Sequence, residues 1–145
     1  MALKTELIGQ RVYVDANILI FVVEEPTPLS AGQFALFRAV EEGLVRAVTS
    51  ELSLTECLVH PLTTNDIELA STYERLLSSE TGLELVPVSR EILIGAAHVR
   101  ARQKLKTPDA IHLASAVSTG ATVFLTDDRR ITTPAQLRLQ SWRSL

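Results

Sequence analysis

The chain has 145 residues, of which 46% are hydrophobic and 21% charged, with a net charge of −3 and a pI near 5.6. This composition is typical of a globular domain with its own core, and it excludes a disordered chain, a collagen-like repeat and a disulfide-stapled miniprotein. The negative charge is the wrong sign for a protein that binds nucleic acid with its whole surface. Action on a polyanion therefore requires a metal ion or a local basic patch.

The N-terminal segment MALKTELIGQ lacks the apolar run of a signal peptide, and no apolar stretch approaches the ~18 residues that span a membrane. The single cysteine, Cys57, has no partner for an internal disulfide. We therefore expect a cytoplasmic protein that does not enter a membrane.

Four apolar runs alternate along the chain with segments that carry helix-start signals. The runs are predicted to be β-strands and cover residues 11–23, 44–48, 83–88 and 122–126. Helices are predicted to start at polar residues that suit an N-cap: Ser30 with Gln33, Asn65 with Glu68, and Ser89 before Ile92. This alternation favours a parallel sheet covered on both faces. The sequence thus predicts an α/β fold, a three-layer α/β/α sandwich with a central parallel sheet, in a single domain over residues 1–145.

The first predicted strand contains an acidic residue, Asp15. In an open α/β sheet, ligands bind at the carboxyl ends of the strands, so acids at those ends are candidates for a functional site. A carboxylate beside Val14 and Ile18 is costly to bury unless it is paired or bound to a cation. The alternative is structural, an Asp that ends a strand and caps the next helix.

Glu56 follows the second predicted strand, in a helix that Thr49 or Ser50 would cap. Helical spacing places Glu56 on one face with Leu52 and Val59, which is unusual for a carboxylate. If this apolar stripe is out of phase with the core, Glu56 is simply solvated.

Asp109 lies in the first turn of another predicted helix, with Thr107 as the N-cap and Pro108 as the first helical residue. A helix N-terminus favours an anion by itself, which is the structural alternative for this Asp. His112 shares its face, three residues later, and is expected to be a packed or supporting residue rather than a metal ligand.

The last predicted strand is followed by Asp127 and Asp128, and then by Arg129 and Arg130. Two adjacent Asp residues usually mark a turn. Here, however, the acids that follow several strands converge at one edge of one sheet, and clustered carboxylates need a cation at neutral pH. Oxygen ligands without a Cys₂/His₂ pattern favour Mg²⁺ or Mn²⁺, and such a site predicts phosphodiester hydrolysis.

Four segments resemble motifs of the PIN-domain nucleases, in particular the VapC-like toxins of type II toxin–antitoxin pairs. The segments are VDANIL at 14–19, SELSLTE at 50–56, TPDAIHLASA at 107–116 and FLTDD at 124–128. The resemblance implies a PIN fold with a central parallel sheet and endonuclease activity on single-stranded RNA with Mg²⁺ or Mn²⁺. It also implies frequent homodimers and a cognate antitoxin as partner.

The resemblance assigns the acidic residues to the site one by one. Asp15, Glu56 and Asp109 match three acidic positions of the family, whereas the fourth acid is Asp128 by spacing, with Asp127 as the alternative. We expect Asp15 and Asp109 to be the principal metal ligands, and Glu56 and the fourth acid to complete the ligand set or orient the attacking water. Removing Glu56 is expected to relieve repulsion and so to stabilise the metal-free protein.

Polar and basic residues near the motifs have supporting roles in this hypothesis. Asn17 and Thr126 match supporting polar positions of the family. The basic stretch from His98 to Lys106, together with Arg129 and Arg130, could supply contacts with RNA phosphates, and the candidates singled out are Arg102, Lys104, Lys106 and Arg129. The alternative is that these cations are a solvated helix end.

The helix predicted at Ser30 has an apolar face with Phe34, Phe37 and Val40, which usually means core. In the resembled family, such early helices also take part in dimer or antitoxin contacts.

Two other functions are alternatives to a ribonuclease. A phosphatase of the haloacid-dehalogenase type also places an Asp after its first strand, but it needs a second Asp two residues later, where this chain has Asn17. A catalytically silent module that binds a protein or RNA is the other alternative.

Overall fold

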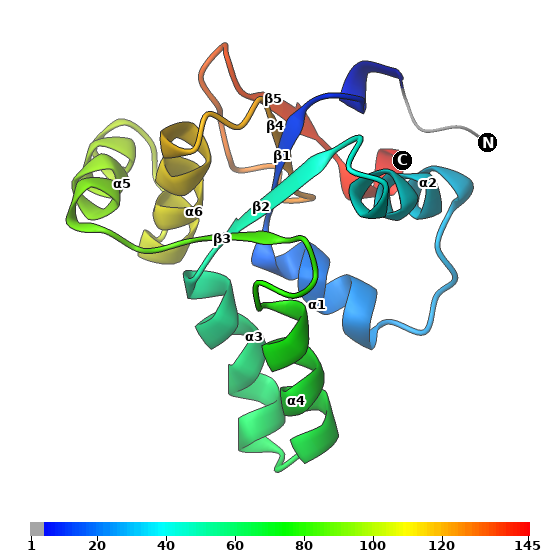
Figure 1. Ribbon diagram of the computed structural model, residues 1–145. Helices are drawn as coiled ribbons and strands as arrows, with labels where there is room; N and C mark the ends of the chain where they lie inside the picture. Colours follow the sequence, from blue (N-terminus) through cyan, green and yellow to red (C-terminus); the bar gives the residue numbers. More distant parts are fainter. Residues whose placement is uncertain (1–4) are drawn as a thin grey trace.

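The structure, a computed structural model, describes residues 5–145, and a five-stranded parallel sheet lies at its centre (Figure 1). The order of the strands across the sheet is β3-β2-β1-β4-β5. Their bounds are β1 Arg11–Val14, β2 Arg46–Ser50, β3 Glu84–Val86, β4 Val123–Leu125 and β5 Arg138–Gln140.

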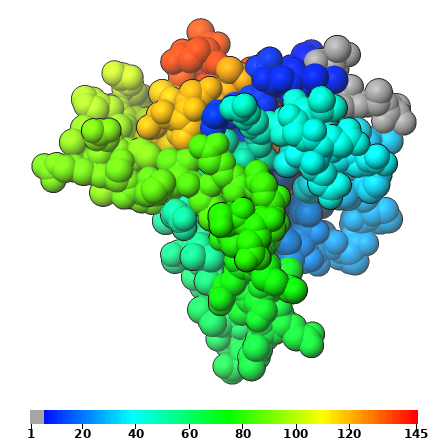
Figure 2. Space-filling view, viewed as in Figure 1, coloured from blue at the N-terminus to red at the C-terminus, as the bar shows by residue number. Residues whose placement is uncertain are grey.

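Helices cover both faces of the sheet. Their bounds are α1 Ala16–Glu24, α2 Ala31–Glu41, α3 Leu52–Thr63, α4 Ile67–Leu76, α5 Arg90–Arg102 and α6 Thr107–Ser118, with short 3₁₀ helices η1 Thr5–Leu7 and η2 Trp142–Ser144. The α3–α4 pair projects from the body of the molecule (Figure 2). No helix within residues 5–145 has the length and apolar character needed to cross a membrane.

The pleat of the central strands divides the core into two layers. In β1, Val12 and Val14 pack toward α1–α4 and η2, whereas Tyr13 faces α6 on the opposite side. β4 repeats this alternation, with Val123 and Leu125 on the first face and Phe124 on the second, stacked on Tyr13. The predicted α/β/α sandwich with a central parallel sheet is therefore confirmed.

The prediction that residues 11–23 form one strand was wrong. The strand ends at Val14, and Ala16–Glu24 forms α1. The apolar run is continuous because Ile18 and Leu19 are buried and the next four residues are half-buried. A helix packed on more than one side has no polar face, so periodicity could not separate it from a strand.

The predicted N-caps differ in their outcome. Ser30 and Gln33 form the expected capping box, and Ser89 caps α5. The α4 cap lies one residue later than predicted, because Asp66 rather than Asn65 accepts the hydrogen bond from Leu69 N.

The helices that carry Glu56 and Asp109 also start away from their predicted caps. α3 has Glu51 at its N-cap position, and Ser50 Oγ instead accepts a hydrogen bond from Leu52 N. α6 begins at Thr107, with Lys106 as the N-cap. Asp109 therefore remains in the first turn of α6, one position later than predicted.

Strand β5 had no counterpart in the prediction. Its three residues are Arg138, Leu139 and Gln140, of which only Gln140 is buried. A three-residue edge strand with two exposed side chains gives no periodic signal.

The strand order changes direction at β1, because later strands are added on both sides of it. From there the chain builds outward through β2 and β3, then returns to the other side of β1 with β4 and β5. The carboxyl ends of β1 and β4 therefore lie side by side at a switch point, where open α/β sheets bind ligands.

Candidate active site

Asp15 is the most deeply buried acid at the switch point. It follows β1 directly, its side chain has only 4% of its surface exposed, and its backbone N–H donates to Leu125 O. The Thr126 hydroxyl donates to Asp15 Oδ2 over 2.7 Å. The continuous apolar segment around Asp15 thus buries a carboxylate at the end of the central strand, where the Thr126 hydroxyl donates to it.

Thr126 joins this acid to the next one. It follows β4, and its Oγ1 also accepts a hydrogen bond from Asp128 N at 3.0 Å. A single buried hydroxyl therefore fixes the position of Asp15 relative to Asp128. The supporting role expected for Thr126 stays a prediction.

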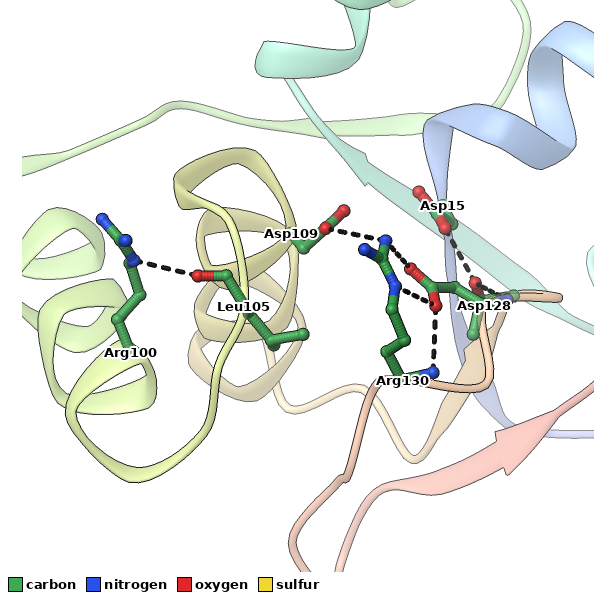
Figure 3. A network of polar contacts seen from close by, with 7 residues as sticks. Asp15, Arg100, Leu105, Asp109, Asp128 and Arg130 are labelled. Carbon is green, nitrogen blue, oxygen red and sulfur yellow. Dashed lines mark hydrogen bonds and ion pairs between the residues drawn. The ribbon is translucent and has the colours of Figure 1, made fainter.

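Asp128 and Asp109 share a cation supplied by the chain itself (Figure 3). The Arg130 guanidinium donates to both oxygens of Asp128, from Nε at 3.0 Å and from Nη2 at 2.7 Å. Nη2 also reaches Oδ2 of Asp109, in the first turn of α6, at 3.5 Å. Arg130 follows Asp127 and Asp128 in the sequence, but its contact with Asp109 was not predicted.

Glu56 lies at the end of a buried chain of hydrogen bonds. Its Oε1 is 2.5 Å from His112 Nε2, and His112 Nδ1 is 2.6 Å from the hydroxyl of Tyr13. Burial raises the pKa of the Tyr13 hydroxyl, which therefore remains a donor. The network assigns the hydrogen of the ring to Nε2, so that His112 donates to the Glu56 carboxylate.

The predicted apolar stripe through Glu56 is out of phase. The buried face of α3 contains Ser53, Cys57 and Pro61, whereas Val59 is exposed. Glu56 borders this buried face and is half-buried by its contact with His112 rather than solvated. Tyr13 was missed by sequence reasoning because it lies inside an apolar strand, where a hydroxyl gives no separate signal.

The carboxylates affect each other's protonation. Burial raises the pKa of Asp15, although His112 and the Thr126 hydroxyl lower it in part. Burial also raises the pKa of Asp109, and the charges of Asp128 and Asp15 raise it further. The Arg130 guanidinium instead holds the pKa of Asp128 below its ordinary value. Asp15 and Asp109 are thus two acids for which an additional cation would be favourable.

Asp127 points away from this group. Its Oδ1 accepts hydrogen bonds from the Ser141 hydroxyl at 2.7 Å and from Arg143 N at 3.3 Å, and its Oδ2 is 3.6 Å from Arg143 Nε. Asp127 therefore ties the segment after β5 to the end of β4. Of the two alternatives for the fourth acid, Asp128 is the one that lies with Asp109 and Asp15.

The other expected polar residues lie around the acids at different places. Asn17 is exposed in the first turn of α1. Lys106 and Arg129 are exposed next to the acid-bearing segments, and Arg129 lines a hollow of about 340 Å³ together with Asp128. Arg102 instead lines a separate hollow of about 690 Å³ between α5 and α6, and Lys104 is exposed in the α5–α6 loop.

The acids are close together but are not arranged as a closed ligand set. Within the described residues, no three His, Cys, Asp or Glu side chains are already placed to hold a metal ion together. Each acid is instead held by a partner from the chain: Asp15 by Thr126, Glu56 by His112, and Asp109 with Asp128 by Arg130. The donor set consists of carboxylate oxygens, and a guanidinium already bridges two of them, so the residues suit a hard divalent cation.

The comparison with family models gave one match, to the PIN domain, over residues 12–136. This range contains each of the acids described above. The comparison with curated proteins gave no match.

Solved structures with the same fold come from toxin–antitoxin systems. VapBC2 from Rickettsia felis, bound to a DNA fragment from its promoter, matches with a TM-score of 0.71 and 14% identity over 91% of this chain and 98% of that chain. A toxin–antitoxin complex from Klebsiella pneumoniae matches with a TM-score of 0.63 and 20% identity, over 87% and 94%. The sarcin–ricin loop cleaving toxin VapC20 from Mycobacterium tuberculosis matches with a TM-score of 0.60 and 15% identity, over 78% and 86%. At these identities the likeness is one of fold.

Proposed function

The chain belongs to the PIN-domain family, and from this premise we propose that it is a Mg²⁺- or Mn²⁺-dependent endoribonuclease that hydrolyses phosphodiester bonds of single-stranded RNA. We further propose that it is the toxin of a toxin–antitoxin pair. The observation that carries the proposal is the convergence of Asp15, Asp109 and Asp128, from three separate segments, on one space at the carboxyl edge of the sheet (Figure 3). PIN-domain nucleases generally use divalent metal ions, and a fold neighbour is an RNA-cleaving toxin.

The acids and His112 have different roles in the proposed reaction. Asp15, Asp109 and Asp128 bind the cation, and Glu56 completes the ligand set or orients the attacking water, with His112 holding its carboxylate in place. A divalent cation held by these carboxylates would supply Lewis-acid chemistry, activating a water and stabilising negative charge on the phosphoryl and leaving oxygens.

The substrate is held by basic side chains near the acids. We assign the phosphate contacts beside the scissile bond to Lys106 and Arg129, which border the segments that carry Asp109 and Asp128. Arg102, at the end of α5, and Lys104, in the loop that follows, contact RNA that extends past the site. Because the net charge is −3, these local cations supply the attraction that the whole surface does not.

The direct test is cleavage of a mixed single-stranded RNA pool by the purified protein. We expect cleavage with Mg²⁺ or Mn²⁺, none in EDTA, and recovery when the metal is restored, whereas duplex RNA of the same sequences stays intact. Cleavage that persists in EDTA contradicts the metal-dependent mechanism. Absence of both metal binding and cleavage favours the catalytically silent module instead.

The proposed partner is a cognate antitoxin, as in the VapBC complexes that share the fold. A hollow of about 260 Å³ lies between the sheet and helices α1 and α2, with Phe37 and Val40 of α2 in its lining, and we assign the antitoxin contact to the exposed apolar side of α2 next to it. Phe34 on α2 is 55% exposed.

To test this contact, the product of a small reading frame that abuts this gene would be titrated against the purified protein. Phe34→Ser is expected to weaken binding, whereas Val59→Ser on α3, which removes an equally exposed apolar side chain, serves as the matched control. Equal affinity of the two variants would contradict the proposed face. The homodimer expected from the resemblance is measured on the same samples by light scattering.

A further inference from the structure

The Arg130 guanidinium spans two of the acids that the proposed metal site requires (Figure 3). It is bonded to both oxygens of Asp128, at 3.0 and 2.7 Å, and it reaches Asp109 at 3.5 Å. A guanidinium is a planar fork that matches a carboxylate with two parallel hydrogen bonds. The chain thus supplies its own cation to Asp109 and Asp128.

The local sequence sets the position of this cation. Asp128 Oδ1 accepts a hydrogen bond from Arg130 N at 3.0 Å, which closes a tight turn over two residues. The turn brings the side chain of Arg130 back over Asp128. The contact therefore depends on the order Asp128-Arg129-Arg130 and on the position of α6, which presents Asp109.

The same cation is free to leave. The Arg130 side chain is 61% exposed, and its hydrogen bonds within residues 5–145 go only to Asp128 and Asp109. Because the pair is exposed, water can replace the hydrogen bonds that the guanidinium gives up when it leaves. Rotation of one side chain therefore uncovers carboxylate oxygens of both acids without a change in the fold.

A divalent ion and the guanidinium would be only a few ångströms apart on the same carboxylates, and like charges at that distance repel. We propose that Arg130 is an internal counter-ion that competes with the divalent cation for Asp109 and Asp128, so that metal binding requires its side chain to swing out of the site. This inference rests on the proposed metal-dependent function and adds a device that sets the metal concentration at which the site fills.

The test is calorimetric titration of Mn²⁺ and Mg²⁺ into the wild type, Arg130→Gln and Arg129→Gln. Arg129→Gln is the matched control, because it removes an equal charge one residue away, from an exposed side chain that does not pair with either acid in the described structure. We expect Arg130→Gln to bind metal roughly threefold or more tightly than the wild type, and the control to differ by less than about twofold. Arg130→Lys keeps the positive charge but cannot form the two parallel hydrogen bonds of a guanidinium. Its affinity for the metal should therefore lie between those of the wild type and Arg130→Gln.

Thermal unfolding gives a second readout that also shows whether each variant folds. At a fixed subsaturating Mn²⁺ concentration, the metal-induced rise in Tm should be larger for Arg130→Gln than for the wild type, because tighter binding stabilises the folded state more. Equal or weaker metal binding by folded Arg130→Gln overturns the competition and leaves metal-dependent cleavage standing. Absence of metal binding in both proteins overturns the competition and the proposed function together.

Discussion

The acids of the site are held in two different ways, on an inner and an outer side. On the inner side, Asp15 and Glu56 accept hydrogen bonds from Thr126 and His112, which are buried in the core. On the outer side, Asp109 and Asp128 are bridged by the exposed side chain of Arg130.

The contacts on the inner side are therefore fixed by the core, whereas the contact on the outer side can be exchanged. Buried donors cannot leave without unpairing polar groups in the core, and this costs more than moving an exposed side chain. The inner side therefore fixes the positions of its carboxylates, whereas on the outer side one cation can replace another. Substitutions on the two sides should therefore differ in their effects on stability and on RNA cleavage.

The largest effect is expected from neutralising one metal-binding acid on each side. Asp15→Asn and Asp109→Asn should each reduce metal-dependent RNA cleavage by more than about 100-fold, since loss of a ligand exceeds the loss of a residue that only supports one. Circular dichroism should show both variants folded. Full activity in either variant contradicts its assignment as a ligand.

Asp15→Asn should also raise the stability of the metal-free protein, because it removes a charge whose burial is unfavourable. The expected gain is on the order of 1 kcal/mol in the free energy of unfolding. A loss of stability in urea denaturation would mean that the hydrogen bond from Thr126 outweighs the cost of burying the charge.

A large loss of stability is expected from removing His112, the central residue of the hydrogen-bond chain that links Tyr13 to Glu56. His112→Ala removes a ring that is 1% exposed, and it leaves the Tyr13 hydroxyl and the Glu56 carboxylate without their partner. We expect the free energy of unfolding to fall by about 3 kcal/mol. Asp109→Asn, on the outer side, is the comparison, and denaturant titration measures the stability of both variants. Equal stability of the two would contradict the difference between the inner and outer sides.

A smaller loss is expected from Glu56→Ala. Removal of this acid was expected from the sequence to stabilise the metal-free protein, but the bond to His112 reverses the sign. The variant leaves a buried N–H without its acceptor, and stability should fall by about 1 kcal/mol. Glu56→Gln keeps an acceptor oxygen and should recover most of that loss, which the same denaturant titration would detect.

The smallest effect is expected at Asp127. Asp127→Asn preserves an acceptor for Ser141 and weakens only the exposed pairing with Arg143, so stability should change by about 0.5 kcal/mol or less. Cleavage should remain within about threefold of the wild type, whereas Asp128→Asn should lose most of it. Equal losses in the two variants would show that the choice between the neighbouring acids is wrong.

Much of the fold was predictable because N-cap residues and apolar runs mark where helices and strands begin. Ser30 with Gln33 and Ser89 with the apolar residues that follow defined two helix starts to the residue. α1 was hidden, because a helix packed on more than one side has the same apolar pattern as a buried strand. β5 was hidden because its pairing with β4 comes from the rest of the sheet rather than from its own three residues.

The α/β alternation can be predicted from local sequence patterns, and so can the acids at the ends of segments that a parallel sheet brings to one edge. How those acids are held follows from the packing of the elements. Asp127 and Asp128 are equivalent neighbours in the sequence, and the turn after β4 directs one toward Ser141 and the other toward Asp109 and Arg130. Likewise, the chain from Tyr13 through His112 to Glu56 joins residues from β1, α6 and α3. The physical reason is that side-chain hydrogen bonds depend on direction and on distances of a few ångströms, which are set only when the elements have packed.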